Sequence, residues 1–488
     1  MSSARQAADM YNHDYIGPEH ILIGILNEGS AESVAMLEKL SIKSAKLLSS
    51  VESKMVVVGG KAASTQLPFT GPAKKVLEHS IHEAILLEHN YVGIEHLLLG
   101  LLRVENTLAA EAFKSSNISY EDIREKIKAF VGRDSAGKFT TPSTASLYNI
   151  SATLETLLAG RSLTSQAATE LMQAIVAGHV GAASIAALAV ALRAKGETIE
   201  ELAAFARVMR ESSVRVEAPE DTIDTCGTGG DGSGTFNIST AAALIAAGMG
   251  IPIAKHGARS ASSLTGSADV LKALGVNIDA NAECVARCIK RAGIGFMFAP
   301  SHHPGLKHVA PVRRELGIKT FFNLTGPLSN PANTGRQVIG VYDPSLCEKF
   351  AQVLHMLGSR SAMIVCGTGP GGKGHLDEVS TFGPTAIARL SEGRIELTRF
   401  EATTLGIPLA EPGALSAANA TESAATIRSI LDGQKGVPRD IAALNAAAAA
   451  IVAGQAIEWG EAFGLAQKSI DSGAAKRALE KLVEEAKG

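Results

Sequence analysis

Residues 224–240 read Asp224-Thr-Cys-Gly-Thr-Gly-Gly-Asp-Gly-Ser-Gly-Thr-Phe-Asn-Ile-Ser-Thr240 and decide the fold of the C-terminal part of the chain. A strand end, a loop and a helix start follow one another here, and five glycines let the loop backbone approach a ligand closely. The helix that begins near Ser239 adds the positive end of its dipole. The stretch therefore predicts a phosphate or diphosphate site. The alternative, a tight turn, seldom needs so many glycines.

The same loop satisfies the dinucleotide fingerprint G-x-G-x-x-G with Gly227, Gly229 and Gly232. A dinucleotide-binding site typically has an acidic residue about 20 positions further on, and its carboxylate binds the ribose hydroxyls. Here that region reads Ile251-Pro-Ile-Ala-Lys-His-Gly257 and is basic. Lys255 stands between an apolar run and a glycine, which favours a binding role over a solvated surface position. We therefore expect a highly phosphorylated ligand rather than NAD.

Two adjacent carboxylates, Asp377 and Glu378, lie between apolar residues at the end of a second glycine-rich loop. A diphosphate ligand usually brings Mg²⁺, which binds oxygen atoms and retains several waters. The pair is therefore a candidate magnesium site, and the alternative is a solvated acidic surface. The loop itself, Gly369-Pro-Gly-Gly-Lys-Gly374, is not a P-loop, because neither Ser nor Thr follows its lysine.

The pattern of apolar and glycine residues changes at Ile223. From there on, short apolar runs alternate with glycine-rich turns and alanine-rich helices, which predicts an α/β domain with a mostly parallel sheet. Before it, helical periodicity runs from Leu147 to about Ser213, with Thr164 or Ser165 as the N-cap of one helix. Small polar residues precede that helical segment, as in a linker. The expected units are a linker at 134–146, a small helical domain at 147–215 and a large α/β domain at 216–488.

The N-terminal third contains two copies of one motif. The stretch Asn12-His-Asp-Tyr-Ile-Gly-Pro-Glu-His-Ile-Leu-Ile-Gly-Ile-Leu26 returns 76 residues later as Glu88-His-Asn-Tyr-Val-Gly-Ile-Glu-His-Leu-Leu-Leu-Gly-Leu-Leu102. Each copy predicts a helix, a tight turn and a second, apolar helix, so residues 1–133 should form an all-helical pseudo-symmetric domain. His20 and His96 stand at helix starts without a second ligand four residues on. A structural role is therefore favoured over metal binding.

Composition excludes several classes of function. The 488 residues include 46 Lys and Arg against 49 Asp and Glu, and only 14 Phe, 6 Tyr and 1 Trp. No basic face or stacking platform for nucleic acid is indicated, and the longest apolar run, 446–454, is too short to span a bilayer. Five cysteines without a CxxC pair are typical of a reducing compartment. We expect a cytoplasmic protein that binds neither nucleic acid nor membranes.

The double repeat resembles the N-terminal repeat domain of the Clp chaperone ATPases over nearly all of residues 1–133. The paired Gly-x-Glu-His-Leu/Ile-Leu pattern carries the match. In that family the domain receives adaptors and unfolded substrates for an ATPase motor, and no motor motif follows in this sequence. The resemblance therefore implies a protein partner for residues 1–133, which would act as a regulatory or targeting module.

Residues 147–488 resemble the anthranilate phosphoribosyltransferases of tryptophan biosynthesis. The motifs that carry the match occur in order: Cys226-Gly-Thr-Gly-Gly-Asp231, Asn237-Ile-Ser-Thr240, Lys255-His-Gly-Ala-Arg-Ser-Ala-Ser-Ser263, Gly266-Ser-Ala-Asp269, Val312-Arg-Arg-Glu-Leu-Gly317, Phe322-Asn-Leu-Thr-Gly-Pro-Leu328 and Arg439-Asp-Ile-Ala-Ala-Leu-Asn-Ala446. The resemblance implies a homodimer whose small helical domain joins a large α/β domain of the nucleoside phosphorylase and phosphoribosyltransferase type. It implies that the aromatic amine attacks C1 of the ribose as pyrophosphate leaves, without a dedicated nucleophile.

The resemblance also implies roles for individual residues. Mg²⁺ would be held by Ser239, Asp377 and Glu378. Anthranilate would be held by Gly227, Ala258 and Arg313, with the Arg313 guanidinium pairing with the substrate carboxylate. Phosphoribosyl pyrophosphate would be held by Gly227, Gly230, Asp231, Thr235, Asn237, Ile238, Ser239, Thr240, Lys255, Ser263 and Ser267. Three histidines are candidate proton acceptors, although structural roles are favoured for them: His256, His302 and His303.

The sequence departs from the family at two places. Ala258 stands where the family has an asparagine, and a lost hydrogen bond to a ligand costs about 0.5–1.5 kcal/mol. The loop before Asp377 lacks the family's usual His-Gly-x-Asp-Gly run. Two alternatives stay open: a related transferase with another acceptor, or a protein-binding adaptor with a degenerate enzyme domain. A pyrimidine nucleoside phosphorylase shares the fold, but the run 266–269 argues against it.

Overall fold

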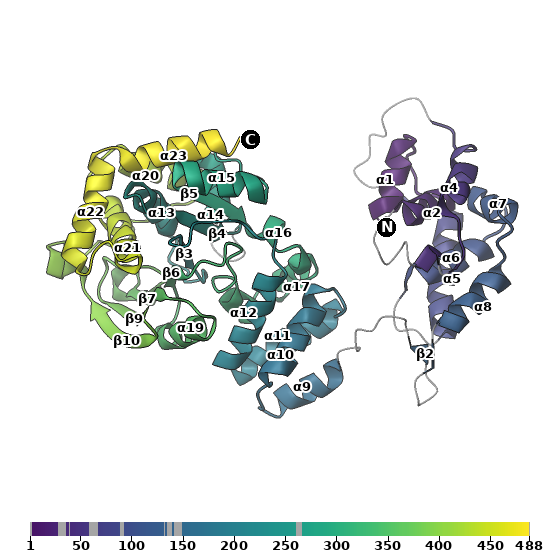
Figure 1. Cartoon of the computed structure of the whole chain (residues 1–488), viewed down its shortest axis with the longest axis horizontal. Coiled ribbons are helices and arrows are strands. Elements are labelled where there is room, and N and C mark those ends of the chain that lie inside the picture. The colour runs from purple at the N-terminus through teal and green to yellow at the C-terminus, as the bar shows by residue number, and fades with distance from the viewer. Residues whose placement is uncertain are drawn as a thin grey trace. The chain divides into compact units, whose positions relative to one another are not determined.

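The computed structural model divides the chain into two compact units, Met1–Ser146 and Leu147–Gly488 (Figure 1). Of the expected linker, only the short strand β2 (Phe139–Thr140) is described, which pairs antiparallel with β1 (Gly132–Arg133). The structure describes residues 2–27, 36–38, 40–57, 67–87, 92–130, 132–133, 139–140, 149–259 and 266–487. Among these residues, no helix is long and apolar enough to cross a membrane.

The first unit is helical, as the repeat predicts. Its helices are α1 (Ser2–Met10), α2 (Pro18–Leu26), α4 (Ser44–Glu52), α5 (Gly71–Leu86), α6 (Ile94–Arg103), α7 (Leu108–Ser115) and α8 (Tyr120–Phe130). The repeat places α1 and α2 in the first copy and α5 and α6 in the second, and within each copy the two helices pack together. Leu22 of α2 and Leu98 of α6 are fully buried in one shared hydrophobic core.

The two repeat histidines cap helices. The Gly17 backbone N–H donates to His20 Nδ1 at 2.9 Å, and the Gly93 N–H donates to His96 Nδ1 at 2.8 Å. Each bond satisfies one of the backbone groups left open at a helix start. The imidazole nitrogen that faces the helix start is therefore occupied, which supports the structural role favoured from the sequence.

The second unit begins with a bundle of four helices, α9 (Ile150–Leu158), α10 (Ser165–Val176), α11 (Ala182–Lys195) and α12 (Ile199–Glu211). Thr164 is the N-cap of α10, because its hydroxyl accepts the Ala167 N–H at 3.2 Å. Two helices that come much later in the chain, α17 (Val309–Leu316) and α18 (Phe321–Thr325), pack against α11 and α12. The bundle is thereby joined to the segment that carries Arg313.

A sheet with the strand order β10-β9-β7-β6-β3-β4-β5 follows. The strands are β3 (Ile223–Gly227), β4 (Ile253–Gly257), β5 (Ile294–Phe298), β6 (Arg336–Gly340), β7 (Ser361–Thr368), β8 (His375–Leu376), β9 (Thr385–Ser391) and β10 (Arg394–Phe400). The five strands β3 to β7 are parallel, which confirms the expected mostly parallel sheet. The hairpin β9–β10 adds an antiparallel edge, and its turn uses positive φ at Glu392 (49°) and Gly393 (77°).

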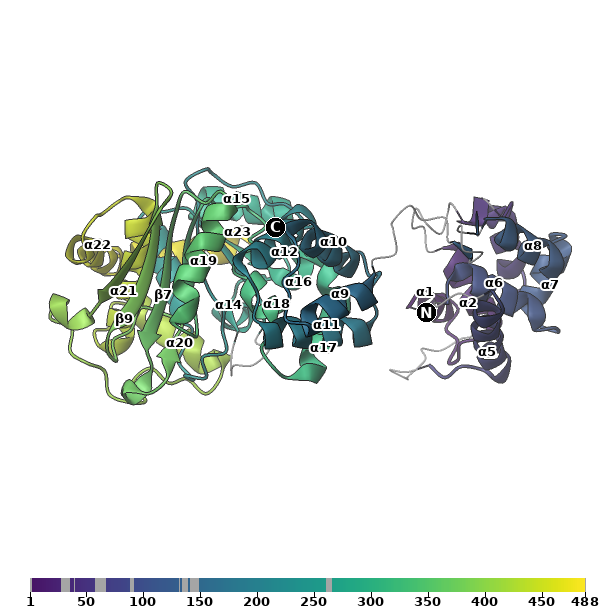
Figure 2. The ribbon, with the colours of Figure 1, turned by 90° about the horizontal axis from the view of Figure 1, so that it is seen from below.

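Helices cover both faces of this sheet. One face carries α13 (Ile238–Gly248), α14 (Ser267–Leu274), α15 (Ala282–Ala292), α20 (Ala420–Leu431), α21 (Val437–Ala453), α22 (Trp459–Asp471) and α23 (Ala474–Glu485). The other carries α19 (Ser345–Met356) and the bundle; Figure 2 shows α21 and α19 on opposite sides of β7 and β9. Neighbouring residues of β7 alternate accordingly, Met363 and Val365 facing one core and Ile364 the other. Short helices complete the unit: α16 (Ala299–His302), η1 (Pro304–His308), η2 (Pro370–Gly372) and η3 (Ala402–Leu405).

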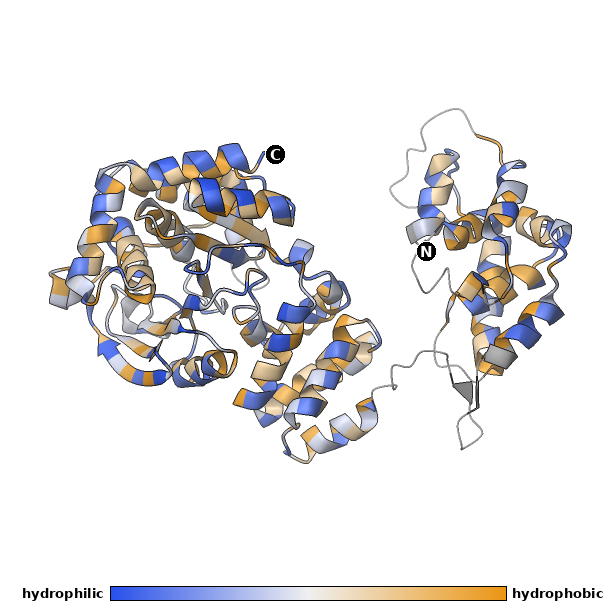
Figure 3. Cartoon of the chain, in the orientation of Figure 1, coloured by the Kyte–Doolittle hydropathy of each residue, from blue (hydrophilic) through white to orange (hydrophobic). Residues whose placement is uncertain are grey.

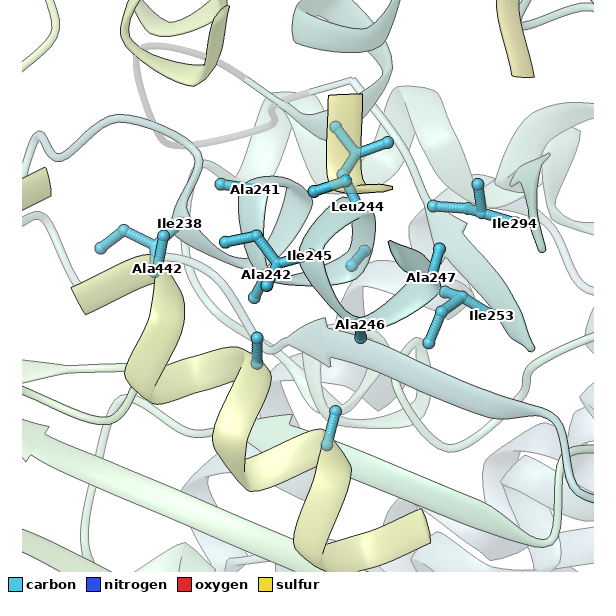
Figure 4. Packing of buried hydrophobic residues seen from close by; sticks show 14 of the residues in the cluster. Ile238, Ala241, Ala242, Leu244, Ile245, Ala246, Ala247, Ile253, Ile294 and Ala442 are labelled. Atoms are coloured by element: carbon cyan, nitrogen blue, oxygen red, sulfur yellow. The ribbon is translucent and has the colours of Figure 1, made fainter. Parts of the chain in front are cut away.

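Alanine makes the packing behind the glycine loop close. Figure 4 shows Ala241, Ala242 and Ala246 of α13 next to Ala442 of α21 and Ile253 of β4, and all five are buried. Small side chains let α13 and α21 approach one another, and both helices pack against the sheet, α13 on β3 and β4 and α21 on β6 and β7. The outer helix α23, by contrast, carries both hydrophilic and hydrophobic residues (Figure 3).

Candidate active site

The glycine loop connects the end of β3 to the start of α13. Gly229, Gly230, Gly232 and Gly234 have φ values of 66°, 73°, 71° and 66°, in the left-handed region that other residues rarely adopt. Such curled backbone turns successive N–H groups toward one concavity, where they bind anions. Only glycine adopts these positive φ values readily, so the loop requires glycine at the four positions. The concavity lined by N–H groups is suited to a diphosphate.

The N-terminus of α13 completes this anion site. No side chain caps its first turn; the Asn237 Oδ1 instead accepts the Thr240 hydroxyl, and the Asn237 N–H donates to Ser423 Oγ at 2.9 Å. Asn237, Ile238 and Ser239 line the adjoining cavity. The backbone N–H groups at the start of α13 and the helix dipole both favour negative charge at this point.

A cavity of about 260 Å³ lies beside the loop, at the carboxyl ends of β3 and β4. Most residues expected from the sequence line it: Gly227, Gly230, Asp231, Thr235, Asn237, Ile238, Ser239, Lys255, Ala258, Ser267, Arg313, Asp377 and Glu378. Thr240 does not, because its side chain is fully buried and its hydroxyl holds Asn237 instead. Ser263 lies outside the described residues. One cavity therefore unites segments more than a hundred residues apart.

Lys255 is a buried cation at the base of the cavity, with only 1% of its surface exposed. Its Nζ donates to the Thr225 carbonyl at 2.6 Å and to Ser239 Oγ at 3.1 Å. Burial lowers the pKa of Lys255, and the nearby Asp224 carboxylate opposes that shift. An ammonium group has three donors, so one donor remains for a ligand oxygen. This arrangement supports the expected binding role of Lys255.

Glycines at the strand ends let the acidic pair approach the loop. A Cβ on Gly340, the last residue of β6, would lie 1.5 Å from the Asp377 carbonyl oxygen, and one on Gly227 would lie 2.5 Å from Asp377 Oδ2. Asp377 Oδ2 also accepts the Gly229 N–H at 2.9 Å. Asp377 thus reaches the glycine loop only because both strands end in glycine.

Burial and mutual repulsion make these carboxylates costly to ionise. Burial, and then the charge of Asp231, raise the pKa of Asp377 to about 7. Burial, and then Asp377, raise the pKa of Glu378 well above its usual range. The region is therefore short of positive charge, which a divalent cation would supply.

The donor set fits Mg²⁺. Among the described residues, no three His, Cys, Asp or Glu side chains converge into a ready-made metal cage. Mg²⁺ does not require one, because it binds through one or two carboxylates together with waters and substrate phosphates. Asp377, Glu378 and the Ser239 hydroxyl line the cavity beside the glycine loop and offer such a set.

The cavity also offers a site for an organic acid. Arg313 on α17 lines it, and no carboxylate pairs with the guanidinium among the described residues; burial lowers the pKa of Arg313. Ala258 lines the same cavity with an exposed methyl group and offers no side-chain hydrogen bond. Arg313 can therefore bind a substrate carboxylate, while Ala258 leaves space in the cavity.

Three buried histidines lie next to one another. The His256 and His303 rings are 5.0 Å apart, and the Nε2 atoms of His256, His302 and His303 have no hydrogen-bond partner among the described residues. Burial lowers the pKa of His303 to about 4 and the pKa of His256 well below its usual range. All three are neutral near pH 7, but only His256 of the three lines the cavity.

Asp224 and Asn323 are among the residues at the site to which the sequence analysis gave no role. Asp224 is fully buried beneath the cavity, and its Oδ1 accepts the His256 backbone N–H at 3.2 Å, which ties β3 to β4. Asn323 lines the cavity from α18. Both stood inside recognisable motifs, at the start of the glycine stretch and in Phe322-Asn-Leu-Thr-Gly-Pro-Leu328, but neither has a spacing that marks it as functional.

Comparison with known families agrees with this architecture. The helical bundle domain of a glycosyl transferase family matches residues 151–213, and the a/b domain of that family matches 219–476. The Clp repeat (R) N-terminal domain matches 1–94 and again 68–159. Fold and cavity together thus define a glycosyl transferase preceded by a Clp repeat domain.

Comparison with individual relatives identifies the family more specifically. An anthranilate phosphoribosyltransferase from Parvibaculum lavamentivorans is 49% identical over 327 residues, 67% of this chain and 94% of the relative. The crystal structure of the Thermus thermophilus enzyme is 39% identical with a TM-score of 0.64, covering 69% of this chain and 99% of that one. The Saccharomyces cerevisiae enzyme in complex with PRPP and Mg is 26% identical with a TM-score of 0.63, covering 71% and 99%. The chain belongs to the anthranilate phosphoribosyltransferase family.

Proposed function

We propose that the chain transfers the phosphoribosyl group from phosphoribosyl pyrophosphate (PRPP) to the amine of anthranilate and releases pyrophosphate, a step of tryptophan biosynthesis. The observation that carries this proposal is the single cavity that is lined by the anion loop, by a buried acidic pair and by Arg313. A diphosphate ester and an aromatic acid would thereby meet inside one enclosure. Family membership supports the same reaction.

The residues would act mainly by charge and alignment. The glycine-loop N–H groups, the start of α13 and Lys255 bind the diphosphate, where negative charge grows as the bond from C1 of the ribose breaks. Arg313 holds the acceptor carboxylate, which aims the neighbouring amine at C1. The amine forms the new bond and loses a proton as pyrophosphate departs. No protein nucleophile takes part.

Mg²⁺ is the cofactor in this proposal, and Ser239, Asp377 and Glu378 would hold it. Bound there, the ion would neutralise charge on the leaving pyrophosphate. The buried carboxylates support this assignment, because a divalent cation beside them would offset the cost of ionising them in a buried site. The Saccharomyces cerevisiae relative, whose structure is a complex with PRPP and Mg, gives further support.

The test is to incubate the full chain with PRPP, Mg²⁺ and anthranilate and to follow the loss of anthranilate fluorescence. We expect loss that depends on both PRPP and Mg²⁺. Replacing the acidic pair, Asp377→Asn together with Glu378→Gln, should abolish it while the protein stays folded. Constant fluorescence with folded wild-type protein would overturn the proposal.

A second candidate keeps the donor and changes the acceptor. Ala258 favours it, because the exposed methyl group at this position leaves room in the cavity for a substituted aminobenzoate. Competition among ring-substituted anthranilates, with product ratios read by mass spectrometry, tests this candidate. A clear preference for unsubstituted anthranilate would exclude it.

The remaining assignments are also proposals. We assign 1–133 to the Clp-like domain that binds a protein partner, 134–146 to the linker, 147–215 to the dimerising bundle and 216–488 to the catalytic domain. Exposed Leu158 on α9 (72%) and Val190 on α11 (44%) support dimerisation through the bundle. Five free cysteines support a cytoplasmic location. Light scattering and pull-down with the full chain test the two associations.

A further inference from the structure

Asn323 is a polar residue of the cavity to which the proposed function gives no role. It belongs to the short helix α18, in which Phe321, Phe322 and Leu324 are buried against the bundle. Asn323 is the partly exposed member of this helix, and it lines the cavity. The apolar neighbours therefore fix α18 in place, and Asn323 is the side chain that it offers to a ligand.

The orientation of the Asn323 amide is set by one hydrogen bond. Its Oδ1 accepts the Thr320 backbone N–H at 3.0 Å, at the start of α18. The other end of the amide, Nδ2, has no hydrogen-bond partner among the described residues, yet it is not sealed from solvent. A side-chain amide carries two N–H donors on this nitrogen. Asn323 therefore presents unused donors at the cavity wall.

The elements connected to α18 carry other residues of the cavity wall. The His256 imidazole is hydrogen-bonded to the Gly326 carbonyl, which joins the end of β4 to the residue that follows α18. Ala258 follows directly after β4, and Arg313 lies on the helix that precedes α18. Asn323 and Arg313 therefore stand on consecutive helices that both contribute to the cavity wall.

We propose that Asn323 is an acceptor-binding residue, whose Nδ2 donates a hydrogen bond to the carboxylate of the aminobenzoate next to the Arg313 guanidinium. The inference rests on the proposed function and adds one specificity determinant to it. A carboxylate accepts about four hydrogen bonds, more than one guanidinium supplies. With Ala258 offering no side-chain hydrogen bond, the amide of Asn323 on α18 is the side-chain amide left for the acceptor carboxylate. The site would then select aromatic amines that carry an adjacent carboxylate.

The substitution Asn323→Asp separates this role from a purely structural one. The aspartate keeps an oxygen for the Thr320 N–H, so the start of α18 stays capped. It removes the Nδ2 donors and places a negative charge opposite the substrate carboxylate. We expect the KM for anthranilate to rise about tenfold or more, and the KM for PRPP and the thermal midpoint to stay nearly unchanged.

A matched control is Asn281→Asp, because Asn281 also caps a helix with Oδ1, accepting the Cys284 N–H at 2.9 Å, and does not line the cavity. Equal KM values for anthranilate in the two variants would overturn the inference. Should Asn323→Asp misfold, Asn323→Ser retains an oxygen cap, lacks the amide donors and should show the same rise.

Direct titration of anthranilate fluorescence provides a second readout that does not require turnover. Weaker binding in Asn323→Asp than in Asn281→Asp supports the inference, and equal binding overturns it. If the wild-type chain binds anthranilate without transferring a phosphoribosyl group, the proposed function fails while this comparison still decides the role of Asn323.

Discussion

Individual positions in this site matter as much for the atoms they lack as for those they carry. Gly227 and Gly340 lack the Cβ that would collide with Asp377. Ala258 lacks a polar side-chain group, and Lys255 succeeds as a buried cation only because Thr225 and Ser239 accept two of its hydrogen bonds. The number of hydrogen bonds that Lys255 and position 258 can still make to a ligand affects how tightly that ligand binds.

The first prediction concerns Ala258→Asn. Ala258 is exposed to the cavity, so the longer side chain can be accommodated, and its amide adds a hydrogen bond to the acceptor. We expect the dissociation constant of anthranilate to fall by up to about tenfold, in line with roughly 0.5–1.5 kcal/mol for one hydrogen bond. Fluorescence titration measures it, with PRPP affinity as the control. Unchanged anthranilate affinity would mean that a missing amide is not limiting.

For individual residues, the sequence identified the charged members of the site but did not reveal how deeply they are buried. Asp377, Glu378 and Lys255 were identifiable because carboxylates and lysines are conspicuous between apolar and glycine residues. The raised pKa values of the acidic pair were not predictable, because they depend on burial that forms only in the folded domain. Asn323 was missed since a single asparagine in an apolar run has no local signature, and its meaning comes from the cavity around it.

The elements of the fold show how strand ends build the site. β3 and β6 are parallel neighbours that both end in glycine, and Asp377 lies across the two ends. Alternating apolar runs made the parallel strands predictable. The hairpin β9–β10 was not predicted, because its strands are partly exposed and its turn uses Glu392 with positive φ rather than the usual asparagine.

The second prediction concerns the end of β6. In Gly340→Ala, the new Cβ must displace the Asp377 backbone, an overpacking cost of about 1–3 kcal/mol or more. We expect a lower urea midpoint and a loss of transferase activity larger than the loss of stability explains. Gly464→Ala on α22 is the control, because nothing lies within 4 Å of its added Cβ. Normal activity in Gly340→Ala would contradict the packing argument.

The start of α2 makes the first unit sensitive to acid. Gly17 N–H donates to His20 Nδ1, the other nitrogen of His20 is paired with His13 Nδ1 at 2.9 Å, and His13 Nε2 is paired with the Val56 carbonyl at 2.8 Å. This chain of hydrogen bonds requires a neutral His20. Burial, and then His13, lower the pKa of His20 to about 4, whereas 6.5 is its ordinary value.

The third prediction follows from this depressed pKa. The unfolded unit binds a proton that the folded unit does not, so stability is complete above pH 6.5 and falls as the pH drops toward 4. Between pH 7.5 and pH 5 the loss is about 2 kcal/mol. Urea titration of residues 1–146 by circular dichroism measures it. His20→Gln, which keeps an acceptor at the capping position, should lose less over the same interval, and an equal loss would contradict the assignment.

The whole molecule consists of two units with separate hydrophobic cores. One core holds the helices of the N-terminal unit, and two others lie on the faces of the transferase sheet. Ligand binding should therefore stabilise only the unit that contains the cavity. Trp459, the one tryptophan of the sequence, stacks on Phe400 at 4.1 Å in that unit and reports its unfolding specifically.

The fourth prediction uses this reporter. PRPP with Mg²⁺ at a hundred times the dissociation constant should raise the stability seen by Trp459 fluorescence by about 2.7 kcal/mol. The transition of residues 1–146, followed in the isolated unit by circular dichroism, should not move. In the full chain, a joint shift of both transitions would instead reveal coupling between the two units.

The segments that form the site lie far apart in the sequence, and this affects the order in which they become available during translation. Residues 1–146 are translated before the transferase, and this unit can fold on the ribosome around its own core. β3 must wait for β6, its parallel neighbour, which is translated more than a hundred residues later. The acidic pair follows later still. Every molecule whose cavity has formed therefore carries an N-terminal unit that had the opportunity to fold first, while the transferase was still being made.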